Sequence, residues 1–462
     1  MPTTLSQQNT AWPNPFQSWY MVLVLMLAYT FSFIDRQILN LLVGPIRSDM
    51  HISDFQMSLL MGTAFGVFYA VMGIPISRWI DRMSRRNIVF TGITLWSMMT
   101  MACGMAKNYS HLFLARIGIG AGEATLNPSA FSLLGDSFPE KKRSFPTAVF
   151  HLGIPFGTGL ALIVGGVVID IVSRIEPWRF PFINLSYSWQ MTFIIVGLPG
   201  LLVAMLIMTI NEPRRRGLIQ TSAGNEVSKQ KLPMRKVTGF IAARKLAYFA
   251  IFFGIGMKIT LNYGSNAWVP THFIRTFDWT AGEFGRIYGL CNIAVGVSSI
   301  LFCGLLANYL LSRGVRDANL KVILLGYGIA IPFAIAAPLM PTPTLAIIMF
   351  MVAYFFTNFH VLAPACLIAI TPNQMRGQVS ALYVFIVNIL GLGLGPSIVA
   401  GFTDFVFGSD LAIGKSLATT AAILGPLGFV ILYIGLRAYR RCLDDALEWE
   451  QDNSHTYVGQ GD

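Results

Sequence analysis

Four charged side chains lie within otherwise apolar stretches of the sequence. Asp35 and Arg36 are adjacent in one stretch, and Arg116 and Glu123 are seven residues apart in another, FLARIGIGAGEATLNP. Seven residues are close to two helical turns, so Arg116 and Glu123 would project from one face of a helix, about 10 Å apart along its axis. A charge at the centre of a bilayer costs about 2.5–3.5 kcal/mol, so such residues usually face a partner or an aqueous cavity. The spacing therefore predicts a polar site inside a membrane.

Two of these side chains are carboxylic acids, which can bind and release a proton. Burial favours the neutral acid and a nearby arginine favours the carboxylate, so a conformational change that alters both can move a proton. We expect Glu123 and Asp35 to be the proton-coupling pair, with Arg36 and Arg116 as counter-charges or gates. At 1.5 Å per helical residue, Asp35 and Arg116 reach similar depths, which predicts a pair, and Glu123 falls near the midplane. The alternative is a permanent salt-bridge cluster that only fixes helix packing.

Further polar residues in apolar stretches could line a cavity. Lys258 would lie about 18 Å into its helix, where a cation would suit a phosphate or carboxylate headgroup, or could instead pair with Glu123 or Asp35. A histidine can relay protons, although a hydrogen-bonded packing role is favoured for His151 and His360. The candidates for substrate binding are Lys258, Arg36, Asn262, Tyr263, Trp268, Asn358, Asn388 and His151.

The elements that must position these residues are membrane-spanning helices. Of the 462 residues, 54% are hydrophobic and 12% are charged, whereas soluble domains carry about 25% charged residues. Runs of about 20 apolar residues can cross about 30 Å of hydrocarbon, and they predict an all-α polytopic protein with twelve transmembrane helices. These are Trp19–Leu42, Phe55–Trp79, Asn87–Ala106, Leu112–Leu134, Phe145–Val168, Trp189–Ile210, Leu246–Val269, Phe284–Leu306, Leu320–Leu339, Leu345–Ile370, Val379–Phe402 and Ser416–Leu436.

Basic residues gather after every second predicted helix, which places those loops and both termini in the cytoplasm by the positive-inside rule. The net charge of +11 follows from this topology, so we expect no nucleic-acid partner. The five cysteines lack metal-ligand spacing, and we expect no disulfide and no metal. Since no nucleotide loop, metal cluster or nucleophile motif is found, we expect no enzyme and no cofactor, with the proton as coupling ion.

A polar, basic linker divides the chain into two six-helix bundles. The segment PEKKRSFPTA from Pro139 matches PNQMRGQVSA from Pro372 at identical spacing, and a glycine-rich helix follows each. Duplicated halves related by an axis along the membrane normal are the plan of major facilitator transporters. The predicted organisation is an N-terminal tail (1–18), a first bundle (19–210), a linker (211–245), a second bundle (246–437) and a C-terminal tail (438–462).

The loop SRWIDRMSRR (Ser77–Arg86) resembles the major facilitator signature between helices 2 and 3, with serines in place of both glycines. The resemblance implies a cytoplasmic latch. In it, the aspartate docks on the N-terminus of helix 11 near Gly377, and an arginine meets Asp136 on helix 4. The alternative is a positive-inside loop without a latch. In the second half, Asn308 replaces the usual aspartate, so a second latch would be weak or absent. The matching positions in the first half are Asp81, Arg82, Arg85 and Arg86.

A narrower resemblance, to the Spinster-like branch of bacterial type, rests on FSFIDRQILNLL (Phe31–Leu42) and on Leu95–Pro128. It implies a proton-coupled secondary active transporter that moves a lysolipid or another amphipathic anion or zwitterion by alternating access. We expect a monomer in the bacterial inner (plasma) membrane, with membrane lipids and this lipid-like substrate as its partners. The alternatives are a proton symporter or exporter of small organic anions or drugs on the same fold and, more remotely, a membrane enzyme or channel.

Overall fold

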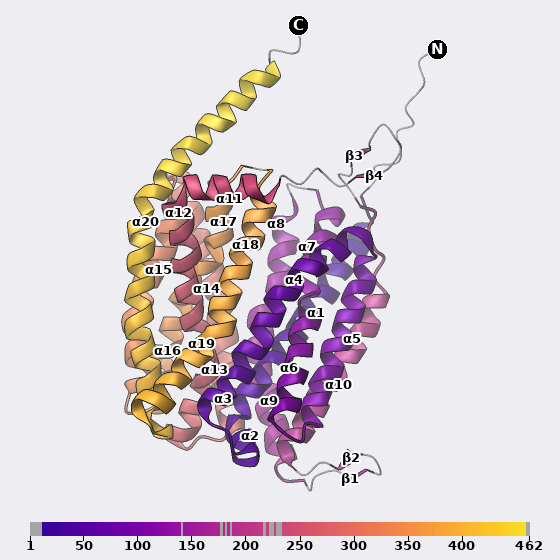
Figure 1. The fold of residues 1–462 in the computed structure, drawn as a ribbon, viewed down its shortest axis with the longest axis vertical. Coiled ribbons are helices and arrows are strands. Elements are labelled where there is room, and N and C mark those ends of the chain that lie inside the picture. Colours follow the sequence, from indigo (N-terminus) through magenta and orange to yellow (C-terminus); the bar gives the residue numbers. More distant parts are fainter. Residues whose placement is uncertain are drawn as a thin grey trace.

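The computed structural model describes residues 12–139, 142–175, 179–180, 183–184, 187–215, 219–220, 226–227, 233–372 and 374–458. Long helices run side by side, with those of the first half on one side of the bundle and those of the second half on the other (Figure 1). We call the end where the first helix begins and the last one ends the terminal face, and the opposite end the far face.

The first half consists of helices, together with one hairpin on the far face whose two strands have two residues each. In that hairpin, Arg179 pairs with Asn184 and Phe180 with Ile183, antiparallel. The elements are α1 (Pro15–Leu41), α2 (Val43–Met50), α3 (Asp54–Ser58), the π-helical turn η1 (Leu59–Thr63), α4 (Ala64–Arg82), α5 (Arg85–Gly104), α6 (Tyr109–Glu123), α7 (Leu126–Ser137), α8 (Ser144–His151), α9 (Gly153–Val172), β1 (Arg179–Phe180), β2 (Ile183–Asn184) and α10 (Ser188–Met208).

The second half is similar, and a second antiparallel hairpin precedes it. Several of its long helices contain short π-helical or 3₁₀ segments (η). The elements are β3 (Ile219–Gln220), β4 (Glu226–Val227), α11 (Met234–Ala243), α12 (Lys245–Phe249), η3 (Ala250–Gly254), α13 (Ile255–Phe277), α14 (Ala281–Ser312), α15 (Ala318–Ala336), η4 (Ala337–Leu339), α16 (Pro343–Thr357), η5 (Asn358–Leu362), α17 (Ala363–Ala369), α18 (Arg376–Asn388), η6 (Ile389–Leu394), α19 (Gly395–Gly401), η7 (Phe402–Phe407), η8 (Asp410–Ala412) and α20 (Ile413–Val458).

Among the described residues, eleven helical segments are long and apolar enough to cross a membrane. They coincide with eleven of the twelve predicted spans. The remaining span, predicted at Leu112–Leu134, is formed by α6 and α7 in succession, with a break after Glu123. At this break the Thr125 hydroxyl donates to the Gly122 carbonyl over 2.8 Å. The predicted all-α polytopic fold is therefore confirmed, with its fourth span in two pieces.

The internal repeat forms the same corner in both halves. Arg143 donates from Nε to the Phe138 carbonyl over 2.8 Å, and Arg376 donates from Nε to the Thr371 carbonyl over 3.0 Å. In each half the arginine and its carbonyl partner are five positions apart. Both residues of the second-half contact lie the same number of positions after their counterparts in the first half. The equal spacing seen in the sequence thus corresponds to an equivalent side-chain contact.

The two halves meet where α9 packs on α14, α1 on α13, and α4 on η6. Glycines bring the α9 and α14 backbones together. A Cβ atom added at Gly159 would lie 2.7 Å from the Gly289 carbonyl oxygen, and one added at Gly289 would lie 2.7 Å from the Gly159 oxygen. Any side chain at either position would separate the helices, so these glycines serve close packing.

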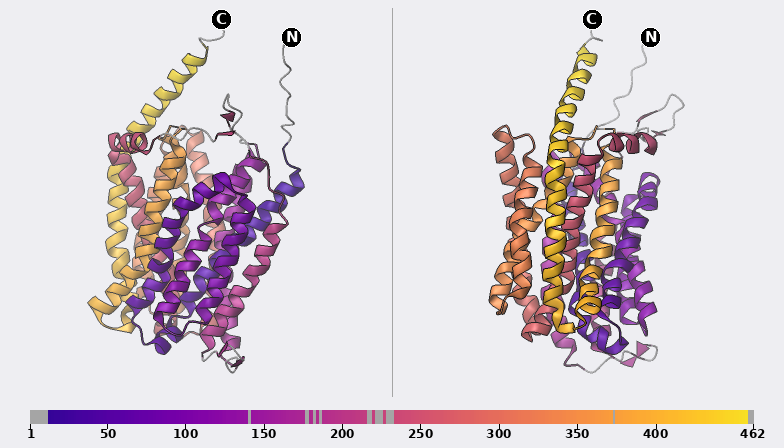
Figure 2. Two further views of the ribbon diagram at one scale, coloured as in Figure 1. Left: turned by 45° about the vertical axis from the view of Figure 1, so that its right-hand side comes forward. Right: turned by 60° about the vertical axis from the view of Figure 1, so that its left-hand side comes forward.

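At the terminal face, two helical regions lie outside the predicted spans. α20 continues to Val458, well past the predicted end at Leu436, and projects from the bundle (Figure 2). Within the segment predicted as a linker, α11 lies across the terminal face of the second half (Figure 1).

Candidate functional site

An ion pair between Arg36 and Glu123 lies inside the first half. α1 supplies Ser32 and Arg36, which are one turn apart and therefore share a face, and Glu123 is the last residue of α6. Arg36 Nη2 lies 2.5 Å from Glu123 Oε2, and the Ser32 hydroxyl donates to the same oxygen over 2.6 Å. The side chains of Arg36 and Glu123 are 8% and 0% exposed. Both charges are thus removed from water and held by charge-assisted hydrogen bonds.

Aromatic rings surround the rest of the Arg36 guanidinium. Its Cζ lies 4.4 Å from the Phe65 ring centroid, 4.7 Å from that of Phe33 and 5.6 Å from that of Tyr69. The Asn127 amide donates to the Tyr69 hydroxyl over 2.9 Å. Ring faces attract a cation most strongly where water is excluded. Arg36 is therefore positioned by one carboxylate and by three rings.

The other two predicted charges, Asp35 and Arg116, do not form the expected ion pair. Asp35 is 1% exposed, and its carboxylate accepts no hydrogen bond from the described residues; Trp96 and Thr100 lie beside it. Arg116 Nε donates to the Leu60 carbonyl over 3.1 Å, while its two terminal nitrogens lack partners among the described residues. Equal depth on two helices does not make side chains meet, and the Arg116 side chain turns toward η1 instead.

Lys258 lies in the second half, away from the four charges of the first. It is 1% exposed, and its Nζ has no hydrogen-bond partner among the described residues. The nitrogen is 5.1 Å from the Tyr327 ring centroid, and Cys303 and His360 are close enough to interact electrostatically with it. The alternative in which Lys258 pairs with Glu123 or Asp35 is not what the structure shows.

Three predicted cavity residues on α13 have different surroundings. The Asn262 side-chain oxygen accepts a hydrogen bond from the Asn266 amide over 3.0 Å. Tyr263 is half-buried and close enough to interact electrostatically with Arg36 across the two halves. Trp268 is fully buried, and its indole donates to the Pro396 carbonyl over 2.9 Å. Its predicted cavity-lining role is not supported, because its polar group joins α13 to α19.

The remaining substrate candidates are half-buried. His151 ends α8, and its ring lies 6.2 Å from that of Tyr29. Asn358 begins η5 beside Tyr354. Asn388 is the last residue of α18. These side chains are spread over both halves and do not form one cluster with Arg36.

A small cavity lies between the halves. α1, α9, α13 and α14 line it, mostly with apolar groups, and four amide or hydroxyl side chains among them are Gln37, Thr158, Asn266 and Asn292. The Asn292 side-chain oxygen is buried without a partner among the described residues. On the α1 side, the Asn40 amide donates to the Asn266 carbonyl over 3.2 Å. None of these four residues was predicted from the sequence, because single amide and hydroxyl side chains in apolar stretches are common.

On the terminal face, Arg85 forms an ion pair with Asp136, the contact that the family resemblance implies. Arg85 also pairs with Glu212, with 2.9 Å between Nε and Oε1, and the Ser84 hydroxyl donates to Oε2 over 2.5 Å. Partial burial raises the pKa of Glu212, but the hydrogen bonds from Ser84 and Arg85 outweigh it and hold the pKa below its usual range. Glu212 was not predicted, although it is the one acid in the basic run NEPRRR.

For the other predicted latch residues, the described part of the structure gives no hydrogen bond or ion pair across the halves. Arg86 donates from Nη1 to the Ile210 carbonyl over 3.3 Å, within the first half. Arg82 is exposed, and Gly377 lies in the first turn of α18. The Asp81 side chain lies outside the described residues, so docking on α18 stays a prediction.

Comparison with known proteins identifies the family. Residues 25–396 match the model of the Major Facilitator Superfamily. An MFS-type efflux pump of Mycolicibacterium smegmatis is 26% identical over 438 residues, which are 93% of this chain and 95% of that protein. Protein spinster of Drosophila melanogaster is 24% identical over 408 residues, which are 84% of this chain and 62% of the fly protein.

Solved structures agree. A bacterial homologue of the human lysosomal transporter Spinster, inward-facing and unoccupied, gives a TM-score of 0.73 at 26% identity, covering 94% of this chain and 98% of that one. Its occupied inward-facing form gives 0.71 at 26% identity, with 93% and 97% covered. The resemblance to the Spinster-like branch is therefore confirmed. The chain belongs to the Major Facilitator Superfamily, and it is a membrane transporter rather than an enzyme.

Proposed function

We propose that the protein is a proton-coupled secondary active transporter that moves a lysolipid or another amphipathic anion or zwitterion by alternating access. The observation that carries the proposal is the buried Arg36–Glu123 pair, with a second carboxyl group, Asp35, unpaired beside it. A buried ionic group without a partner is strongly unfavourable. Asp35 is therefore stable when it carries a proton or gains a cation, which is the chemistry that a coupling site needs.

Proton and cargo are linked through Arg36 in this proposal. While Glu123 is ionised, it neutralises the guanidinium. Protonation of Glu123 removes that negative charge, and the buried arginine then requires another anion. An anionic headgroup that pairs with Arg36 supplies it, so a proton on Glu123 and an anion on Arg36 favour each other.

The surroundings of Arg36 support an amphipathic cargo. The guanidinium is enclosed by the rings of Phe33, Phe65 and Tyr69, so a ligand that reaches it contacts apolar surface as well as charge. Lys258 offers a second buried cation for a headgroup. A relative named as a probable L-galactonate transporter, from Escherichia coli, is 22% identical over 425 residues. It favours the alternative of small organic anions.

The proposed setting follows from the topology. The terminal face carries the basic loops, so we place it and both termini in the cytoplasm, and we place the protein in the bacterial inner membrane. One chain supplies both halves of the site, and we propose that a monomer is functional, with the proton as coupling ion, no other cofactor and no nucleic-acid partner.

The coupling proposal is tested with Glu123→Gln in proteoliposomes. We expect the variant to bind ligand but to lose transport driven by a pH gradient, because the amide cannot carry the proton. Glu283→Gln is the matched control, since Glu283 forms an exposed capping box with Thr280 that glutamine can preserve. Full gradient-driven transport by Glu123→Gln would remove Glu123 from the mechanism.

The cargo is tested by thermal stabilisation of the purified protein. A panel of lysophospholipids is compared with small carboxylates, including sugar acids such as galactonate. We expect lysophospholipids to raise the unfolding temperature, because they supply both an anionic headgroup and an apolar chain. Stabilisation by the small carboxylates alone would reject the lipid proposal and support the alternative.

A further inference from the structure

The small cavity between the halves contains a buried amide whose oxygen has no donor. Asn292, on α14, is 1% exposed, and its side-chain oxygen accepts no hydrogen bond from the described residues. The Tyr354 hydroxyl is close enough to interact with this amide, but it leaves the oxygen unpaired. The cavity is also lined by Gln37 of α1, Thr158 of α9 and Asn266 of α13. Because a buried acceptor without a donor is unfavourable, a donor from outside the chain would be bound here.

A donor group reaches the same cavity from α1. The Asn40 amide donates to the Gln37 side-chain oxygen over 2.5 Å and to the Asn266 carbonyl oxygen over 3.2 Å. Since the Gln37 oxygen is engaged in this way, the NH₂ group of Gln37 is left to donate to a guest. The cavity therefore offers an acceptor from the second half and a donor from the first.

A hydroxyl group fits this pair of atoms. It can donate to the Asn292 oxygen and accept from the Gln37 NH₂ group at the same time, whereas an ionised carboxylate or phosphate only accepts and an ammonium only donates. Among the described residues the lining carries no charged side chain, and it is mostly apolar, with Leu162, Val269 and Phe284 among its members. An ionic group would be poorly stabilised there. The lining suits a hydroxyl on an aliphatic carbon.

The cavity lies about one helical turn from the level of Arg36. Asn40 is four residues beyond Arg36 on α1. Asn266 is three residues beyond Tyr263 on α13, and Tyr263 interacts electrostatically with Arg36. Both helices run toward the far face, so on each of them the step from the guanidinium to the amides is about 5 Å in that direction. A ligand held at Arg36 by its anionic group would carry a nearby hydroxyl at the level of the cavity.

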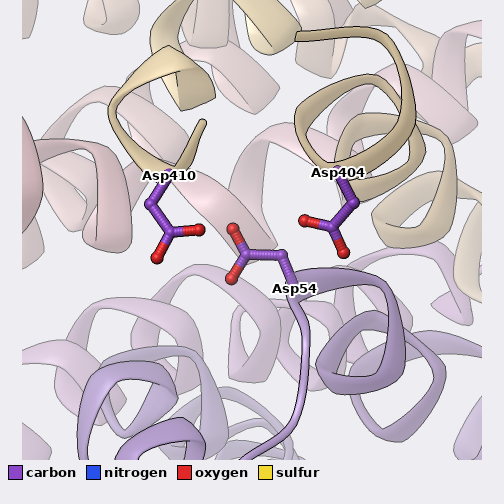
Figure 3. A group of neighbouring side chains, drawn as sticks. All are labelled: Asp54, Asp404 and Asp410. Carbon is purple, nitrogen blue, oxygen red and sulfur yellow. The ribbon is translucent and has the colours of Figure 1, made fainter. Parts of the chain in front are cut away.

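A second polar cluster between the halves is less suited to a ligand. On the far face, Asp54 points toward Asp404 and Asp410, and one oxygen of each lies within 4.8 Å of the others (Figure 3). Arg275 binds Asp54 over 2.6 and 2.8 Å, and Arg47 binds Asp410 over 2.7 and 3.3 Å. Asp404 accepts a backbone N–H over 2.7 Å. These carboxylates already have protein partners, whereas the amide oxygen in the cavity has none among the described residues.

We propose that Asn292 and Gln37 form a subsite for a hydroxyl group of the cargo, carried on an aliphatic carbon near the anionic group that Arg36 binds. The inference rests on the proposed function, because it takes Arg36 as the anion site, and it narrows the substrate class to hydroxylated anions. A lysophospholipid carries this chemistry in its free glycerol hydroxyl, and a sugar acid carries it in its chain hydroxyls. The subsite therefore does not depend on which of the two is transported.

The subsite is tested with pairs of ligands that differ in one hydroxyl. One pair is lysophosphatidate and its analogue without the glycerol hydroxyl, and the other is galactonate and its deoxy analogues. Affinities for the purified protein are measured from ligand-induced shifts of the unfolding temperature. We expect the parent chain to bind the hydroxylated member on the order of tenfold more tightly, and the pair that shows this preference identifies the cargo class. In Asn292→Leu we expect the preference to disappear, because the acceptor is lost while the anion site remains.

Two further variants separate the subsite from a general effect on folding. Asn308→Leu is the matched control and should keep the preference, since Asn308 lies on the same helix but is exposed. Thr158→Val provides a second variant in case Asn292→Leu does not fold. The Thr158 hydroxyl donates to the Ile154 carbonyl of its own helix over 2.9 Å, and its side chain lines the cavity. We expect its removal to weaken the preference in part, because the hydroxyl oxygen can also accept from a guest.

Two outcomes would overturn the subsite alone. Equal affinity of the parent for both members of each pair would assign the cavity to water, and a full preference in Asn292→Leu, or in Thr158→Val if only that variant folds, would place the hydroxyl elsewhere. Both outcomes leave the anion binding of the proposed function intact. Failure of lysophosphatidate and galactonate alike to bind would instead reject the proposed cargo, and the subsite with it.

Discussion

The two halves share a fold but differ in the charges that they enclose. In the membrane-spanning part of the first half, Asp35, Arg36, Arg116 and Glu123 are buried, and one ion pair forms among them. In the corresponding part of the second half, Lys258 is the buried charged residue among those described, and it has no acid beside it. The two halves therefore share one arrangement of helices but differ in the charged residues that they bury.

This difference suggests a division of work. In a site with both carboxylic acids and arginines, a carboxylic acid can gain or lose a proton when its ion-pair partner changes. A buried cation without an acid beside it can only lose its proton or bind an anion. In the proposed mechanism, the first half would supply the coupling chemistry and the second half would supply an anion site. The glycine contact of α9 with α14 and the far-face ion pair of Arg275 with Asp54 join the two halves.

The largest effect is expected from Arg36→Met, which leaves Glu123 buried without its cation. Removal of one partner from a buried ion pair costs about 3–5 kcal/mol, so the variant should unfold at a markedly lower temperature. Glu123→Gln in the same chain should restore most of the loss, because it removes the unpaired charge. Thermal unfolding in one detergent measures both. Equal stability of Arg36→Met and the parent would show that the pair does not hold the first half together.

The positions of the spans could be predicted because a membrane selects apolar runs of fixed length. Eleven of the predicted spans coincide with single helical segments. The fourth was predicted at the right position, but it consists of two helices, because nothing in FLARIGIGAGEATLNP distinguishes a continuous helix from one with a break after Glu123. Helix ends were less accurate. α20 runs to Val458 because polar residues beyond the membrane also form helix, which hydropathy cannot detect.

The sequence predicts which charged residues are buried in the site better than it predicts which of them contact one another. Buried charges are recognisable by residue type, and Asp35, Arg36, Arg116, Glu123 and Lys258 are all buried. Which of them meet depends on helix rotation and side-chain direction. Hence the structure joins Arg36 to Glu123, where depth alone suggested Asp35 with Arg116. The far-face ion pairs of Arg47 with Asp410 and of Arg275 with Asp54 were missed for a related reason. Arg47 and Arg275 look like ordinary loop charges until the halves are assembled.

A smaller effect, on binding rather than stability, is expected from Lys258→Met. Since Lys258 has no hydrogen-bond or ion-pair partner among the described residues, its removal should leave the unfolding temperature unchanged or raise it, unlike the removal of Arg36. If Lys258 contacts an anionic headgroup, affinity for an anionic lysophospholipid should fall on the order of tenfold. Ligand-induced thermal shifts measure this, with Lys258→Arg as the charge-preserving control. Destabilisation as large as that of Arg36→Met would contradict the contrast between the halves.

The smallest effects concern the terminal face, where the halves are alike. Ser84 precedes α5 and its hydroxyl binds Glu212, while Asp317 precedes α15 and binds Arg440 Nε over 2.6 Å. Each contact joins the start of a helix to the chain that follows the last span of its half. Partial burial raises the pKa of Asp317, but hydrogen bonds from Lys321 and Arg440 outweigh it and hold the pKa below its usual range, as found for Glu212.

A lowered pKa in the folded state means that each carboxylate stabilises the fold above its unfolded pKa, about 4.3 for glutamate and about 3.9 for aspartate. That contribution is lost as the pH falls through the lower folded-state pKa. Glu212→Gln and Asp317→Asn should therefore each cost up to about 1 kcal/mol near pH 7, and the difference from the parent should shrink as the pH falls below these unfolded-state values. Unfolding temperatures between pH 7 and pH 3 measure it. Similar losses of stability in the two variants would show that the halves differ in their interiors and not in these terminal-face contacts. A loss of stability that does not depend on pH would instead assign the contacts to packing rather than to charge.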